Sequence, residues 1–158
     1  MSVIALSSGA VFVAGRDDSV APAPAPAAAR ADTWVDVVTG LDRARVAAWS
    51  TVDVRALLTA DAPGSSAVRD DRAVIGRLRI AGLRPVGVRF DVRSVGVVST
   101  TGYRVRLHVV DRRSAYALVD RSGVEAERVD ARAEQVWQVD LVRVAGAWRF
   151  DTEHAVGS

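Results

Sequence analysis

The stretch Val136-Trp-Gln-Val-Asp-Leu-Val-Arg-Val-Ala-Gly-Ala-Trp-Arg-Phe150 alternates apolar and polar side chains on both sides of an Ala-Gly pair. Such alternation places every second side chain on the same face of a β-strand. A glycine-containing pair between two alternating runs is typical of a tight hairpin. The stretch therefore predicts a long strand at 132–144 and a last strand at 147–151, with Trp137, Val139 and Leu141 on the apolar face.

The same period of two continues towards the N-terminus. Residues 86–98 and 103–110 alternate in this way, and 115–119 form a shorter run. In the second run Tyr103, Val105 and Leu107 share one face, while arginines and His108 occupy the other. Turns at 99–102 and 120–123 separate the runs, so we expect antiparallel strands with one apolar face and one face of Arg and Asp.

Helical spacing precedes the strands. Apolar residues recur every three or four positions over 34–49, with Asp42 and Arg45 placed mostly off this stripe. A short second helix is expected after Ser50 or Thr51. A third helix is expected from Ser65 or Ser66 to Ala81, because Gly82 followed by Leu83 and Pro85 is a helix-stop pattern.

These patterns predict one α+β domain, in which three N-terminal helices pack on a curved antiparallel sheet of four to five strands. We place this domain at residues 33–151. Residues 1–32 are expected to form a leader and spacer, and residues 152–158 a tail.

The amino-acid composition excludes several kinds of catalytic and metal-binding site. The chain of 158 residues has no cysteine, which excludes disulfides, Cys-ligated zinc, iron–sulfur clusters and thiol catalysis. All 21 basic residues are arginine and are interleaved with the 19 acidic residues, so the net charge is only +2. Because no basic run exists, we expect no nucleic-acid partner. No phosphate-binding glycine loop or HExxH motif is present, and with only His108 and His154 we expect neither a metal nor a cofactor.

The N-terminal segment suggests a tether. Residues 3–15 are mostly apolar, and residues 19–31 alternate Ala and Pro, which favours an extended polyproline spacer. Thirteen such residues are too few to span a membrane. They fit the end of an anchor or signal that begins upstream, a weak signal peptide, or an unstructured or docked tail. We expect an extracytoplasmic protein, secreted or anchored to a membrane through this segment.

Three stretches resemble the nuclear-transport-factor-2-like superfamily, also called SnoaL-like or cystatin-like. Residues 34–49 resemble its long first helix, 53–58 its following short helix, and 136–150 its closing hairpin. The resemblance covers about residues 33–151 and implies a curved sheet that encloses a conical pocket. Members of the superfamily include isomerases, cyclases, dehydratases and noncatalytic binding domains, so the fold does not decide the function.

The resemblance implies that one face of the sheet lines a pocket. On the predicted register Asp91, Glu134 and Asp140 point away from the pocket, and His108 lies on the polar face. No catalytic residue is therefore assigned. Polar anchors and aromatic rings in an apolar pocket suit ligand binding. The predicted ligand-binding residues are Trp49, Tyr103, Tyr116, Gln135 and Trp137.

The sequence is compatible with three functions. The first is a noncatalytic module that binds a protein partner or a small apolar ligand. The second is a small SnoaL-like isomerase or cyclase that uses the pocket. The third is a homodimer joined through the open sheet face. Arginines on that face are expected to pair with neighbouring acids; they are Arg89, Arg93, Arg104 and Arg106.

Overall fold

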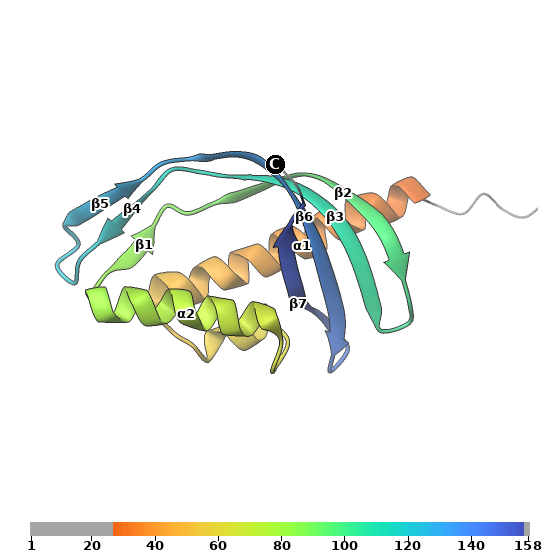
Figure 1. Cartoon of the computed structure of the whole chain (residues 1–158), viewed down its shortest axis with the longest axis horizontal. Coiled ribbons are helices and arrows are strands. Elements are labelled where there is room, and N and C mark those ends of the chain that lie inside the picture. The colour runs from red at the N-terminus through yellow and green to blue at the C-terminus, as the bar shows by residue number, and fades with distance from the viewer. Residues whose placement is uncertain (1–26, 157–158) are drawn as a thin grey trace, which may run out of the picture.

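The computed structural model describes residues 27–156, with side chains from Thr33 onward. The described part contains two α-helices, one 3₁₀ helix and seven strands (Figure 1). In chain order they are α1 (Ala27–Thr51), η1 (Ala56–Thr59), α2 (Ser66–Ala81), β1 (Arg84–Val86), β2 (Phe90–Thr100), β3 (Arg104–Arg113), β4 (Tyr116–Val119), β5 (Glu125–Val129), β6 (Arg132–Val144) and β7 (Ala147–Ala155).

The strands form two antiparallel sheets that continue into one another. The order is β2-β3-β6-β7 in the larger sheet and β1-β4-β5 in the smaller one. In sequence β1 leads into β2, β3 into β4 and β5 into β6, and these runs break at 87–89, 114–115 and 130–131. Gly87 has a φ of 85°, a conformation that favours glycine. The three breaks bend the ribbon along one line, and it arches over α1 (Figure 1).

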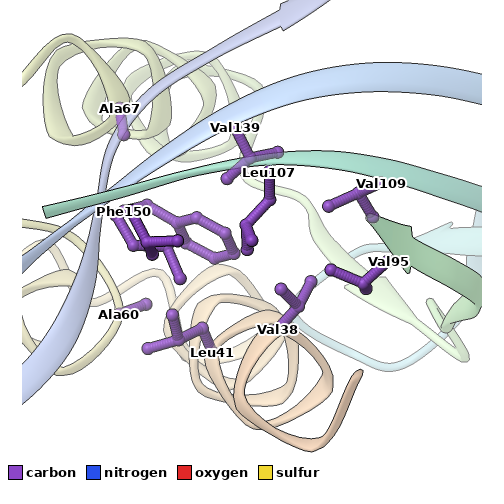
Figure 2. Packing of buried hydrophobic residues seen from close by; sticks show 11 residues of the cluster. Val38, Leu41, Ala60, Ala67, Val95, Leu107, Val109, Val139 and Phe150 are labelled. Atoms are coloured by element: carbon purple, nitrogen blue, oxygen red, sulfur yellow. The ribbon is translucent and has the colours of Figure 1, made fainter. Parts of the chain in front are cut away.

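Two apolar clusters hold the helices against this ribbon. The first lies between α1 and the larger sheet, where Val38 and Leu41 face Leu107, Val139 and Phe150 (Figure 2). The second joins α1 to η1 and α2 and consists of Ala48, Leu57, Val68 and Ile75. Both clusters therefore pack against the same helix, α1.

The α+β class is confirmed, but the predicted numbers of helices and strands are wrong. The expected second helix is the 3₁₀ helix η1, only four residues long. The run 86–98 divides into β1 and β2 at the bend, and β5 had not been predicted. β5 escaped prediction because four of its five residues are exposed and it presents no apolar face.

α1 and β7 are longer in the structure than the sequence predicts. α1 begins at Ala27 rather than residue 34, because the alanine-rich residues 27–31 are good helix formers and contain no proline. β7 runs to Ala155, so residues 152–155, predicted as part of a tail, belong to the sheet. The hairpin at Ala145-Gly146 is confirmed, with φ of 49° and 83°.

α2 begins and ends as predicted. The Ser65 hydroxyl accepts a hydrogen bond from the backbone N–H of Val68 at 3.1 Å. Gly82 takes the left-handed conformation that ends the helix. The predictions for the apolar segment 3–15 and for residues 19–26 lie outside the described residues. Among those that are described, no helix is long and apolar enough to cross a membrane.

Candidate functional site

Two neighbouring cavities lie between the helices and the bent ribbon. The outer cavity has a volume of about 490 Å³ and the inner cavity about 210 Å³. Both are lined by Trp49 and Val74 from the helices and by Phe90 and Arg132 from the strands. Because they share these walls, we treat them as two parts of one site, and we call the larger one the outer cavity and the smaller one the inner cavity.

The outer cavity has mostly apolar walls with a few nitrogen donors. α2, β1 and β4 contribute apolar side chains that include Leu78, Pro85 and Leu118. The indole Nε1 of Trp49 and the Nε atoms of Arg113 and Arg132 are buried and have no hydrogen-bond partner among the described residues. Buried N–H groups normally have a partner, so each of these three residues of the cavity wall carries a donor that is not satisfied.

Neighbouring groups hold the two arginines in place. Arg113 donates to the backbone carbonyl of Asp130 at 3.0 Å, and its guanidinium lies 5.1 Å from the centroid of the Tyr116 ring. Arg132 pairs with Asp111, which also accepts a hydrogen bond from Nε1 of Trp137 at 3.0 Å. These contacts restrict the guanidinium groups before any ligand arrives.

The inner cavity contains a buried arginine surrounded by carboxyl groups. Arg45 is 2.7 Å from Asp71 and 2.7 Å from Glu153, and lies farther from Asp61 and Asp42, at 3.5 and 3.7 Å. Its guanidinium also lies 4.1 Å from the centroid of the Phe150 ring. We call Arg45, Asp42, Asp61, Asp71 and Glu153 the Arg45 cluster. It joins α1, the segment after η1, α2 and β7.

Burial changes the protonation of this cluster. One guanidinium cannot neutralise four carboxylates, and unpaired buried charge is costly. Burial raises the pKa of Asp42 to about 8, although Arg45 opposes the shift. Burial also raises the pKa values of Asp61 and Asp71, and a protonated Asp71 can donate a hydrogen bond to Asp61. Burial lowers the pKa of Arg45, but Glu153, Asp71 and Asp42 outweigh that effect, so Arg45 stays charged.

The structure brings together three of the five predicted ligand-binding residues. Trp49 lines both cavities, Tyr116 the outer one and Trp137 the inner one. Tyr103 lines neither; it lies beyond β2 at the far end of the ribbon with 62% of its surface exposed. Gln135 also lines neither, and its amide donates to the carbonyl of Val136 at 3.2 Å.

Four polar residues were predicted to point away from the pocket, and none of them lines either cavity; they are His108, Asp91, Glu134 and Asp140. Asp140 accepts two hydrogen bonds from Arg106 on the open face of the sheet, at 2.7 and 2.9 Å. Arg93 likewise pairs with Asp91, as the alternation of charges predicts.

The Arg45 cluster was missed, and the placement of Asp42 and Arg45 off the apolar stripe is wrong. Both are buried on α1. A signal was present, because Arg45 lies four positions after Leu41 and three before Ala48, which places it on the apolar stripe. Asp71 likewise lies on the apolar stripe of α2, three positions after Val68 and four before Ile75. Within the part of the chain described, no set of His, Asp or Glu is arranged to hold a metal ion.

No family model matches this sequence, and no curated protein is similar to it in sequence. Solved structures are similar in shape. The intermembrane space region of the chloroplast protein ARC6 has a TM-score of 0.59 at 13% identity, covering 81% of this chain and 97% of that one. Two antiparallel sheets that continue into one another wrap a long helix and leave a cavity between them and the helices. This chain has the NTF2-like fold.

Two further solved structures match with lower TM-scores. A cystatin-like protein from Caulobacter vibrioides has a TM-score of 0.46 at 17% identity, covering 77% of this chain and 89% of that one. An NTF2-like protein of unknown function from Shewanella oneidensis has a TM-score of 0.44 at 12% identity, covering 76% and 96%. At these identities the likeness concerns the fold alone, so the function has to be argued from the cavities.

Proposed function

We propose that this NTF2-like chain is a noncatalytic binding module whose outer cavity takes a small, mainly apolar ligand with an acidic or carbonyl oxygen. The unpaired N–H groups of Trp49, Arg113 and Arg132 carry the proposal. A volume of about 490 Å³ lies within the usual range for small-molecule sites. A ligand oxygen in the cavity removes the cost of leaving these donors unpaired.

Charge favours an anionic oxygen over a neutral one. Arg77, Arg113 and Arg132 line the outer cavity, against a single acid, Glu127. Asp111 compensates Arg132, whereas Arg113 contacts only a neutral carbonyl through its terminal nitrogen. A carboxylate or sulfonate on an aromatic or aliphatic body meets both the apolar walls and the guanidinium groups.

The substitution Trp49→Phe tests the proposal with the apolar anion 1-anilinonaphthalene-8-sulfonate, measured by calorimetry. The ring is kept and only the indole N–H is lost, so Kd should rise about tenfold, the value of one hydrogen bond. Trp34→Phe is the matched control, because Trp34 also lies on α1 but packs against Trp148, 5.2 Å between ring centroids. The control should bind as the native protein does. Equal Kd values for all three proteins, or no binding at all, would count against the proposal.

A second candidate is an acid–base enzyme of the isomerase or cyclase type. It is favoured by Asp42, whose carboxyl lines the inner cavity with a pKa of about 8, suited to proton transfer near neutral pH. The inner cavity of about 210 Å³ is small for a substrate, and its carboxyls surround Arg45, so we rank this function second. It predicts protein-dependent exchange of the α-protons of cyclohexanone in D₂O, lost in Asp42→Asn, as followed by NMR.

The proposed location depends on sequence alone. Residues 3–31 have the composition of an apolar segment followed by a spacer, and from this we infer a tether outside the cytoplasm. Cell fractionation should then recover the full chain with membranes or outside the cell. Recovery in the cytosol alone would contradict this inference. A protein partner remains the other proposed occupant of the module.

A further inference from the structure

A third hollow, of about 550 Å³, lies where the ribbon bends beside α1. Five arginines line it, and the only acid among the lining residues is Asp91. Arg43 comes from α1, Arg89 precedes β2, Arg112 and Arg113 end β3, and Arg132 begins β6. We call this hollow the arginine groove.

The guanidinium charges in the arginine groove are not balanced. Arg112 pairs with Asp91 at 2.9 Å, and Arg132 pairs with Asp111. Arg113 donates only to a neutral backbone carbonyl. Within the described residues Arg43 and Arg89 form no ion pair. Three positive charges therefore face one groove without compensation, although arginines and acids nearly balance over the whole chain.

The wall that carries Arg89 is held by a set of hydrogen bonds. The Ser114 hydroxyl accepts from the N–H of Arg89 and donates to the carbonyl of Gly87, both at 3.0 Å. The N–H of Ser114 donates to the carbonyl of Arg89 at 2.9 Å. These three bonds tie the break before β2 to the break after β3, so the groove exists before any ligand binds.

We propose that the arginine groove binds a small, multiply charged anion of the phosphate class, such as a phosphate ester or a diphosphate. The guanidinium group matches phosphate oxygens with two parallel hydrogen bonds, and several uncompensated guanidiniums require more than one negative charge. The arginines form a local group rather than a stripe along a face, which favours a small anion over a nucleic-acid backbone.

This site adjoins the one in the proposed function and shares part of its wall, but two of its arginines belong to the groove alone. Arg43 and Arg89 line the arginine groove and not the outer cavity, whereas Arg113 and Arg132 line both. Substitution of Arg43 and Arg89 therefore tests the groove and leaves the donors of the outer cavity in place. Retained binding of 1-anilinonaphthalene-8-sulfonate by the same variant reports on the outer cavity independently.

Calorimetry with pyrophosphate at constant salt tests the proposal on the full chain. The double variant Arg43→Gln and Arg89→Gln should weaken pyrophosphate binding at least tenfold. The matched control, Arg72→Gln with Arg121→Gln, removes the same charge from exposed residues that line neither the groove nor the outer cavity. It should bind within about twofold of the native protein, since distant exposed charges are largely screened. Circular dichroism confirms that each variant is folded.

Three results would overturn the proposal. The first is the absence of saturable binding of pyrophosphate to the native protein below about 1 mM, a Kd that corresponds to roughly −4 kcal/mol. The second is a loss of affinity in the control as large as in the groove variant, which would indicate net charge rather than a site. The third is binding of a single-stranded RNA without binding of pyrophosphate, which would identify the groove as a nucleic-acid surface.

Discussion

Asp42 shows how a single buried carboxyl takes its chemistry from its surroundings. It lies 3.7 Å from Arg45, yet Glu153 and Asp71 are closer to that guanidinium. Burial penalises its charged form more strongly than Arg45 favours it, and its pKa rises to about 8. The carboxyl of Asp42 is therefore mostly protonated at pH 7 and adds little negative charge to the cluster.

The pH dependence of stability follows from this shift. The pKa of Asp42 is raised from 3.8 to about 8 on folding, so between these values the folded chain holds a proton that the unfolded chain has released. The free energy of unfolding should therefore fall as pH rises through this window, and this contribution should level off above it. Asp42→Asn cannot ionise and should be more stable than the native protein at pH 9, on the order of a few kcal/mol, with little difference at low pH.

Urea unfolding at pH 5, 7 and 9 measures this effect. Asp36→Asn is the control, because Asp36 is exposed on the same helix. Its profile should run parallel to that of the native protein. If Asp42→Asn also keeps the native pH dependence, the raised pKa of Asp42 is wrong.

At the scale of elements, one glycine inside α2 and one directly after it are under opposite constraints. Gly76 lies inside the helix and Gly82 follows it with a φ of 69°; a Cβ built on either one meets no atom within 4 Å. Gly76→Ala should stabilise the fold by roughly 0.5–1 kcal/mol, because alanine loses less backbone entropy in a helix. Gly82→Ala should destabilise it by about 1 kcal/mol, because alanine is strained in the left-handed region. Thermal unfolding of the two variants checks the signs, and a change of the same sign in both would refute this argument.

Elements with strong local signals could be predicted from the sequence. α2 has a serine cap, apolar spacing and a glycine stop, and β6 alternates over its whole length. Elements that depend on distant partners could not. β5 forms because it pairs with β4, where Tyr116 lies opposite Val129 and Ala117 opposite Arg128. The mostly exposed residues of β5 show no apolar alternation from which this pairing could be predicted.

The candidate site was only partly predictable for a similar reason. Trp49, Tyr116 and Trp137 are large aromatic residues on predicted elements, and the NTF2-like resemblance placed them near a pocket. The arrangement of the walls depends on the bend and on bulges such as those between Val92 and Ser94 and between Asp111 and Arg113. A bulge reverses which side chains face inward, and no local residue pattern marked these positions.

At the scale of the whole molecule, the Arg45 cluster lies between the two cores, which meet along α1. Leu41, one turn before Arg45, belongs to the core under the larger sheet, and Ala48, about one turn after it, belongs to the core with η1 and α2. Its carboxyl partners come from the segment after η1, from α2 and from β7 as well as from α1. The cluster therefore ties the helical side of the molecule to the sheet with charged groups that are mostly buried.

Arg45→Gln should consequently cost far more stability than the loss of an exposed ion pair of similar geometry. It leaves several buried carboxyls without their counter-ion, a change that typically costs about 3–5 kcal/mol. Arg106→Gln is the matched control, since Arg106 also makes two hydrogen bonds to a carboxylate, Asp140, but from the exposed face of the sheet. The stability lost in Arg106→Gln should be much smaller, because water and salt replace an exposed pair.

Urea unfolding followed by both tryptophan fluorescence and circular dichroism measures the two losses. If the cluster couples the two cores, the two signals should separate in Arg45→Gln and coincide in the native protein and in Arg106→Gln. Equal losses for the two variants would show that the buried cluster contributes no more than a surface pair.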